Sequence, residues 1–191
     1  MENPYQYVRD LPLREVTEIQ RTLMDAYLEL SYTKLRSSIR VKELCAAAYV
    51  ARSTFYVHYE SLDELLEHVE NNIIYRLLRL NDAVVYEERT LSAMAFYSET
   101  LAYINRHKRW FHSFLVKEPN FSFMQKWKDA IKLHLWERIR HKGLRSENEG
   151  LILEMVAAEA IAGYTYGLSH PYEINEEYIR RLLVYTLGML E

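Results

Sequence analysis

The chain has 191 residues, 49% of them hydrophobic, so it can bury a core of ordinary size and is not a disordered segment. Its single cysteine, Cys45, excludes an intramolecular disulfide and suits a reducing compartment, so we expect a cytoplasmic protein. The formal net charge of -3 argues against a nucleic-acid partner unless the charge is uneven, and residues 33–60 do carry five Lys or Arg against two Glu.

The spacing of apolar residues predicts an all-α fold. Only 5 Gly and 4 Pro occur, and runs of β-branched residues with period-two alternation are absent. No apolar run approaches the roughly 18 residues that a membrane span needs, and the N-terminus lacks a signal segment. We therefore expect no membrane partner.

Residues 1–11 contain Pro4 and stop before Pro12, and they show no hydrophobic period. We expect them to be a short flexible arm. From Leu13 onward, one apolar stripe predicts a helix of about five turns: Leu13, Val16, Ile19, Leu23, Ala26, Tyr27 and Leu30. This helix is expected to brace two shorter helices that follow it.

The stretch from Ile39 to Leu66 is the most informative part of the chain. Val41, Leu44, Cys45 and Ala48 form one apolar face of a short helix. After a break, Val50 and Phe55 are spaced to fill the angle between this helix and a second one. The other side of the second helix carries Arg52, Ser53, Thr54, Tyr56 and His58. Two short helices with donors facing outward are how a helix-turn-helix reads base edges in the major groove.

The run Val41-Lys-Glu-Leu-Cys-x-x-Ala48, then Val50-x-Arg-Ser-Thr-Phe-Tyr-x-His-Tyr59, then Leu62-x-Glu-Leu-Leu66 resembles the DNA-binding domain of TetR-family transcriptional regulators. The resemblance covers roughly the first third of the chain, and the rest resembles the family only in being helical. It implies a three-helix DNA-binding domain over residues 1–60 and a helical ligand-binding and dimerisation domain over residues 61–191, with about nine helices in all.

Some positions depart from the family pattern. Tyr49 stands where the turn usually has Gly, Asn or Asp, and a left-handed backbone there costs a bulky residue about 1–2 kcal/mol, so a distorted turn is expected. Ala51 replaces a Ser or Asn cap, a loss of about 1 kcal/mol. Leu62 replaces a phosphate-binding Lys, whereas Arg40 offers a phosphate contact of its own. These departures motivate an alternative function, an interaction protein or co-regulator that has kept the helix-turn-helix but lost much of its specific DNA binding.

Ser61-Leu-Asp-Glu64 has the spacing of a capping box and is expected to start a helix that continues to about Asp82. Its apolar stripe is Leu62, Leu65, Leu66, Val69, Ile73, Leu77 and Leu80. Because this helix leads from the DNA-reading unit into the rest of the body, a tilt of it would move the recognition helix. It is the predicted carrier of a ligand signal.

A loop over 87–90 is expected to precede a helix over 91–105, a short helix before Pro119, and a helix over 122–142 that Gly143 ends. This region is the most aromatic part of the chain. Aromatic residues at helical spacing usually form core, and the alternative that the family resemblance implies is a pocket for a planar or apolar small molecule. The candidate lining residues are Tyr97, Trp110, Phe111, Phe114, Trp127 and His134.

No residue pattern in the chain favours an enzyme. His134 and His141 share a helix face but have no carboxylate at ligand spacing, so no metal site is expected. No nucleophile arrangement or Gly-rich phosphate loop occurs, and no cofactor is expected. A third hypothesis, that the chain is an apolar-ligand carrier or an enzyme on a helical scaffold, is supported by the aromatic region alone.

The last two predicted helices, over 148–168 and from about Asn175 to the C-terminus, are apolar on nearly every side. Such helices need a second partner besides their own core. A second copy of the chain would supply it, giving a four-helix interface about a two-fold axis. The candidate interface residues are Met155, Glu159, Gly163, Gly167, Leu182, Leu183 and Leu187.

Together these features predict a homodimeric DNA-binding regulator. Two recognition helices about 34–36 Å apart would read a near-palindromic operator. The candidate DNA-contacting residues are Arg40, Lys42, Arg52, Ser53, Thr54, Tyr56, His58 and Tyr59, with Arg52 suited to pair with a guanine edge. Tyr59 is expected either to pack or to touch a phosphate, and Tyr56 and His58 either read bases or only contact phosphates. Repression relieved by a small ligand is the common mechanism that the resemblance implies, and activation is the alternative.

Overall fold

The computed structural model describes residues 2–11, 16–88, 93–141 and 148–170, together with 181, 182 and 185. Within these residues the fold is all helical and no strand occurs, which confirms the predicted fold class. The helices are α1 (Glu18–Thr33), α2 (Val41–Ala47), α3 (Arg52–His58), α4 (Leu62–Glu88), α5 (Ala93–Arg106), α6 (Lys108–His112), α7 (Phe121–His141) and α8 (Glu149–Ser169). The predicted helix beyond Asn175 lies outside the described residues, apart from three positions.

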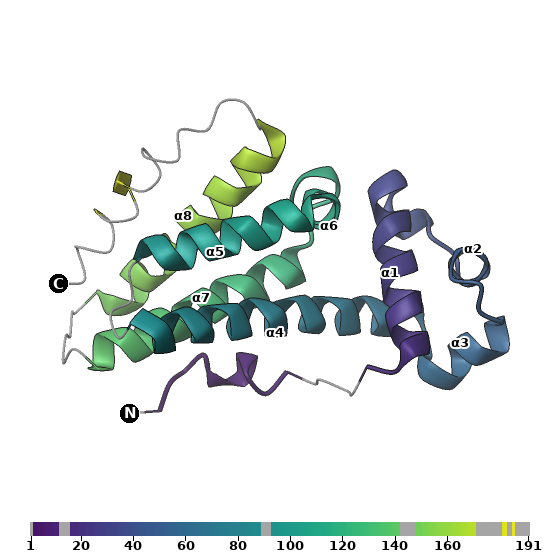
Figure 1. The fold of residues 1–191 in the computed structure, drawn as a ribbon, viewed down its shortest axis with the longest axis horizontal. Coiled ribbons are helices and arrows are strands. Elements are labelled where there is room, and N and C mark those ends of the chain that lie inside the picture. Colours follow the sequence, from purple (N-terminus) through teal and green to yellow (C-terminus); the bar gives the residue numbers. More distant parts are fainter. Residues whose placement is uncertain are drawn as a thin grey trace.

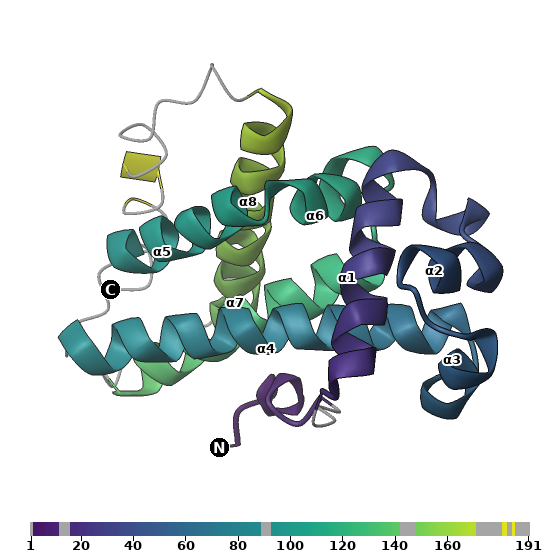
Figure 2. The same cartoon turned by 45° about the vertical axis from the view of Figure 1, so that its right-hand side comes forward.

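Helix α4 runs along the molecule and joins its two ends (Figure 1). Helices α1, α2 and α3 gather at the beginning of α4, and α5 and α7 lie along the rest of it, whereas α8 runs at a steep angle to α4 and packs on α7 (Figures 1 and 2). Ser61 starts α4, because its Oγ accepts from the Glu64 amide at 3.2 Å, while the Glu64 carboxylate accepts from the Glu60 amide at 2.7 Å. The helix has 27 residues and continues past the expected end at Asp82 to Glu88.

Helix α1 begins at a complete capping box. The Thr17 hydroxyl accepts from the Gln20 amide at 3.2 Å, and the Gln20 side chain accepts from the Thr17 amide at 3.1 Å. Its inner face buries Leu23, Tyr27 and Leu28. As predicted, α1 braces the two short helices, and it contacts both α2 and α4.

The aromatic residues of the body form the centre of its core. The Trp127 and Tyr164 rings stack with centroids 5.4 Å apart and planes 4° from parallel, and Tyr97 stacks on Tyr164 at 5.2 Å. Phe111 packs against Trp127 at 5.4 Å. Stacked and edge-on rings contribute about 0.5–1.5 kcal/mol per pair beyond the area they bury. These contacts join α5, α6, α7 and α8 into one body.

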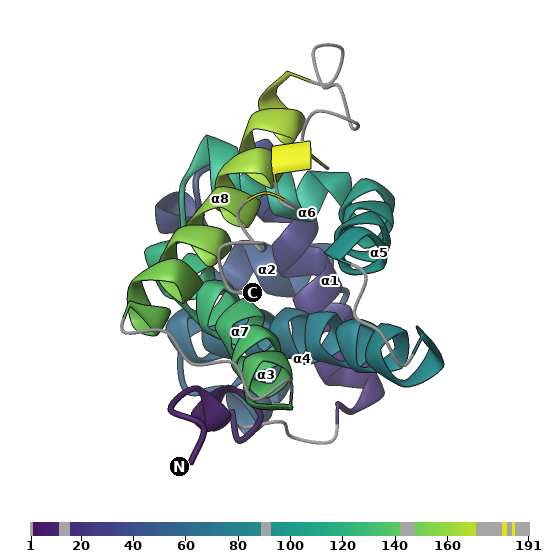
Figure 3. The ribbon, with the colours of Figure 1, turned by 90° about the vertical axis from the view of Figure 1, so that its left-hand side faces the viewer.

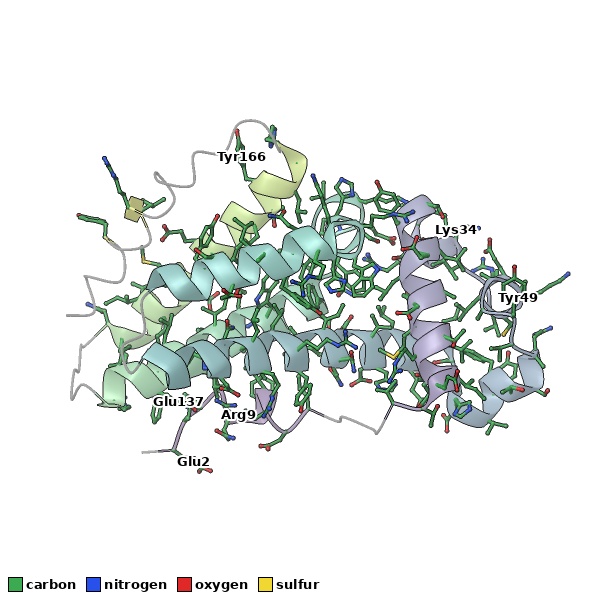
Figure 4. All side chains as sticks on the ribbon, in the orientation of Figure 1. Glu2, Arg9, Lys34, Tyr49, Glu137 and Tyr166 are labelled. Carbon is green, nitrogen blue, oxygen red and sulfur yellow. The ribbon has the colours of Figure 1, made fainter. Side chains whose placement is uncertain are left out.

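The expectation that residues 1–11 form a flexible arm is wrong. Residues 2–11 include a short 3₁₀ helix, η1 (Gln6–Val8), that lies beside α7, and the Val8 side chain is only 1% exposed (Figure 3). Arg9, labelled in Figure 4, donates two hydrogen bonds of 3.0 Å to the Asp82 carboxylate. The Tyr7 hydroxyl donates to Asp129. These pairs span more than 70 residues of sequence, so local periodicity could not reveal them.

Helix α8 is long and apolar enough, by length and composition alone, to cross a membrane, contrary to our expectation that no segment reaches that length. Its inner face is nevertheless part of the protein core, since Leu153, Ala157, Ile161 and Tyr164 are buried. A helix that packs in a protein core can be as long and as apolar as a membrane-spanning helix, so α8 is weak evidence for a membrane.

Candidate nucleic-acid interface

Helices α2 and α3 form a helix-turn-helix that is anchored by buried apolar side chains. Phe55 of α3 and Leu44 of α2 are both fully buried, and Cys45 is 3% exposed. Val50, in the turn, packs against the same cluster. Cys45 is therefore the small core residue that its apolar neighbours predict, and burial raises the pKa of its thiol. The anchoring fixes which side of α3 faces outward.

The turn between α2 and α3 is a regular C-terminal cap. The Val50 amide donates to the Cys45 carbonyl at 2.9 Å and the Tyr49 amide donates to the Ala46 carbonyl at 3.3 Å, which is the pairing of a Schellman motif. This motif needs a left-handed residue at its centre, and Tyr49 supplies it with φ of 54°. The turn is therefore not distorted as expected, and Tyr49 itself carries the strain.

The outward face of α3 carries polar and aromatic side chains. Arg52, Ser53 and Tyr56 are exposed, whereas Thr54 and His58 are half-buried. Val57, which was not among the predicted contact residues, is also exposed, at 78%. Its position could have been found from the helical phase, because residues two from the buried Phe55 point away from it. No side chain caps the first turn of α3, as the Ala51 substitution predicts.

The positive charge that the interface offers is smaller than the sequence indicates. Arg40 and Lys42, at the start of α2, are exposed. Lys34, by contrast, forms an ion pair with Glu43, and Arg36 is bound to carbonyl groups of the body. Of the five cations over residues 33–60, three are thus directed to solvent: Arg40, Lys42 and Arg52.

Tyr59 is not part of this surface: of its two expected roles the structure shows packing, and its assignment as a DNA contact is wrong. Its side chain is 2% exposed, and its hydroxyl lies 2.8 Å from Nδ1 of His68 on α4. The residue ends α3 in an extended conformation that turns the ring into the core, where it packs on Phe55. Tyr59 therefore fixes α3 on α4 rather than touching DNA.

No protein-family model matches this chain, and no curated protein matches it. Several solved structures do. A putative TetR-family regulator from Shewanella sp. PV-4 is 16% identical over 90% of this chain and 96% of its own, with a TM-score of 0.69. A TetR regulator from Streptococcus agalactiae 2603V is 20% identical over 97% and 98%, with a TM-score of 0.67. The dihydroxyacetone kinase operon activator DhaS is 18% identical over 91% and 98%, with a TM-score of 0.65.

The chain has the TetR-family fold. At these identities the likeness concerns the arrangement of the helices, and it extends over the body as well as over the helix-turn-helix. The sequence resemblance reached only the first third of the chain.

In this TetR fold, α4 is not the only link between the helix-turn-helix and the body. A π-helical turn, η3 (Ser113–Lys117), binds the end of α1 and the segment after it. The Ser113 hydroxyl donates to the Ser31 carbonyl at 2.9 Å and Lys117 donates to the Tyr32 carbonyl at 2.6 Å. Arg36 in turn donates to the Ser113 carbonyl at 3.0 Å. These bonds satisfy carbonyls at the end of α1 and hold the unit formed by α1, α2 and α3 at a second point.

A buried polar cluster connects α4 to the start of α7. The Glu70 carboxylate, which is 4% exposed, accepts from Asn120 at 2.6 Å, from Ser122 at 3.0 Å and from Lys126 at 2.8 Å. Lys126 also donates to Asn71 at 2.9 Å, and the Asn120 side chain caps α7 by accepting from the Phe123 amide at 3.1 Å. Because each polar group has a partner, the cluster fixes the register of α7 on α4.

The six candidate ligand-binding residues lie in or against the core of the TetR body. Tyr97, Phe111, Phe114, Trp127 and His134 are at most 3% exposed, and Trp110 is half-buried. The four aromatic residues among the buried five contact other rings directly, so they fill the space between the helices. The rings therefore form core, as aromatic residues at helical spacing usually do. A ligand pocket among them would require these rings to move apart.

His134 makes the stability of the fold depend on pH. Burial lowers the pKa of its imidazole to about 4, Asp82 at 3.8 Å opposes this effect, and Arg9 adds to it. Between the ordinary value of 6.5 and the folded value, the unfolded chain binds a proton that the folded chain does not. The free energy of unfolding is therefore expected to fall as the pH falls through this range.

Urea unfolding between about pH 7 and pH 4.5 measures this dependence, and His134→Gln should make the slope shallower. The exposed His170→Gln is the matched control and should keep the slope of the parent protein. Equal slopes for the two variants would contradict the prediction.

The candidate dimer residues of α8 lie on and beside an exposed apolar face. Met155 is 49% exposed, and it belongs to a stripe made of Leu151, Met155, Ala158, Ala162 and Tyr166. Glu159, Gly163 and Gly167 are half-buried beside the stripe, and Leu182 is 43% exposed. Leu183 and Leu187 lie outside the described residues. Nothing within 4 Å would meet a Cβ added to Gly163.

A groove of about 800 Å³ opens between α7 and α8, next to this face. Its lining is mostly apolar and includes Phe121, which is 81% exposed, and Tyr166.

Among the described residues, no group of three or more His, Cys, Asp or Glu side chains could hold a metal ion.

Proposed function

We propose that the chain is a cytoplasmic, DNA-binding transcriptional regulator that acts as a homodimer and is not an enzyme. The observation that carries this proposal is the outward face of α3, on which Arg52, Ser53 and Tyr56 are exposed while Phe55 anchors the helix from behind. We further propose a DNA-binding domain over residues 1–60 and a regulatory and dimerisation domain over residues 61–191. The segment over 2–11 belongs to the first by sequence but packs on the second.

The proposed DNA contacts divide by exposure. Arg52 is suited to base readout, because its planar guanidinium can pair with O6 and N7 of guanine. Ser53 and Tyr56 share its exposed face, and the half-buried Thr54 and His58 can reach the flanking backbone. Arg40 and Lys42 add positive charge for phosphates, which increases affinity without adding sequence specificity.

The exposed stripe on α8 supports a dimer. A contiguous apolar face on a soluble chain commonly marks an interface, and a second copy provides a complementary face by symmetry. We propose that the two subunits meet there and hold their recognition helices about 34–36 Å apart, or a multiple of that distance. The operator would then be nearly palindromic.

The sign of regulation is also a proposal. We propose a repressor that a small ligand releases from its operator, as the TetR fold would allow. DhaS, one of the structures similar to this chain, is by contrast an operon activator. Transcription in vitro from a promoter that carries the operator separates the two possibilities, since a repressor lowers the transcript level and an activator raises it.

The proposed function is tested by selecting duplexes from a random library with the full-length protein. We expect a selected site with two related half-sites, bound more tightly than a scrambled duplex by about 1000-fold or more. The affinity should fall steeply between low and moderate salt. A protein that docks another protein through a retained helix-turn-helix would select no site, and this result would overturn the proposal.

Met155→Arg is expected to break the dimer, because it places a charge in the middle of the apolar face of α8. Light scattering after size exclusion should show the parent protein as a dimer and the variant as a folded monomer with weaker operator binding. Ser98→Arg, on the exposed side of α5, adds the same charge elsewhere and should remain dimeric. A monomeric parent protein, or a dimeric Met155→Arg, would refute the interface.

A further inference from the structure

Tyr49 is the most exposed large hydrophobic side chain among the described residues. Its side chain is 97% exposed, so the ring packs against almost nothing in the free protein. Its backbone has φ of 54°, and it is the one non-glycine residue with positive φ among the described residues. Figure 4 shows it at the α2–α3 end of the molecule, far from Tyr166 on α8.

In the free protein, the strained backbone of Tyr49 is not offset by packing of its exposed ring. The left-handed position in the Schellman motif suits glycine, which has no Cβ to clash, and a tyrosine there is strained. Strain of this kind is normally offset by contacts of the side chain, and here the exposed ring makes almost none. A strained residue that only backbone hydrogen bonds hold in place, and whose side chain makes almost no contact in the folded state, is a candidate for side-chain contacts made on binding.

The position of Tyr49 indicates what it would contact. Only Val50 and Ala51 separate it from Arg52, the first residue of α3, so it stands beside the proposed base-reading surface. It belongs to the turn rather than to the helix that would enter the groove, which places it over the edge of the groove. The groove edge is lined by phosphates and sugars, and tyrosine hydroxyls are common donors to phosphate oxygens.

We propose that Tyr49 is a DNA-backbone contact whose phenol donates a hydrogen bond to a phosphate beside the bases that α3 reads. This inference rests on the proposed function and adds a residue to it. The contact is neutral, so it adds affinity without releasing a counterion. It should be equally strong on any sequence, because every nucleotide presents a phosphate.

Tyr49→Gly and Tyr49→Phe test the proposal on a duplex selected by the parent protein. Tyr49→Gly should raise the Tm of the free protein by about 2–4 °C, since it relieves the strain, while it weakens DNA binding by about tenfold. Tyr49→Phe keeps the ring and the strain but loses the donor, so it should weaken binding without raising the Tm. Neither change should alter the dependence of affinity on salt.

Lys42→Ala is the matched comparison, because it removes a charged contact from the same surface. It should weaken binding and reduce the salt slope by about one per subunit. Parent-like binding by Tyr49→Phe, or parent-like or tighter binding by Tyr49→Gly, would overturn the Tyr49 contact while leaving the proposed function intact. A parent protein that selects no duplex would overturn both.

Discussion

Arg52→Ala is expected to lower the affinity of the dimer for its operator by roughly 30-fold or more. A bidentate contact between arginine and guanine contributes about 1–3 kcal/mol, and a symmetric operator loses one such contact in each half-site. The loss should be largest for the guanine that Arg52 reads, so the variant should also discriminate less at that base pair. The fold should be unaffected, because the Arg52 side chain is exposed.

Fluorescence anisotropy with the selected duplex, and with duplexes altered at single positions, measures both effects. Arg79→Ala removes an exposed arginine from α4 and is the matched control. It should bind like the parent protein. If Arg52→Ala bound with parent affinity and parent specificity, α3 could not be the base-reading element that we propose.

Glu70→Ala is expected to cause the largest loss of stability. It removes the acceptor shared by Asn120, Ser122 and Lys126, and it leaves the Lys126 ammonium, 16% exposed, without its carboxylate. Breaking a buried ion pair by removing one partner costs about 3–5 kcal/mol. For a chain of this size each kcal/mol lowers the Tm by about 2–4 °C.

Glu67→Ala is the matched control, one turn earlier on the exposed side of α4, and it should change the free energy of unfolding by less than about 0.5 kcal/mol. Chemical denaturation followed by circular dichroism measures both variants. A loss below about 1 kcal/mol for Glu70→Ala would show that the buried cluster is not a significant source of stability.

The Glu70 cluster and the bonds made by η3 have a common consequence for the proposed regulation. The unit of α1, α2 and α3, which we propose binds DNA, is held by α4, which Glu70 ties to α7, and by η3, which binds the end of α1. A ligand or partner that shifts α7 or η3 would therefore act on the recognition helix through two routes. The lever predicted from the length of α4 is one of them, and the second route depends on contacts between residues more than 80 positions apart.

Local patterns were sufficient wherever one element determines its own structure. The apolar stripes of α1 and α4, the capping residue Ser61 and the all-round apolar character of α8 are properties of neighbouring residues, and the structure contains each helix with shifts at its ends. The outward side of α3 followed from Phe55 alone. Even so, Tyr59 was misassigned, because whether a residue at the end of a short helix turns inward depends on His68 of another helix.

The sequence by itself determined that this chain is all-α, that it carries a helix-turn-helix near its start, and which side of α3 faces outward, because helical periodicity and turn chemistry act over a few residues. Only the tertiary structure decided that residues 2–11 bind the body, that Arg36 and Lys34 bind other groups of the protein, and that the aromatic residues form core. These outcomes depend on charges and rings brought together from distant segments. Their partners are defined by the packing of helices, which periodicity along one helix does not encode.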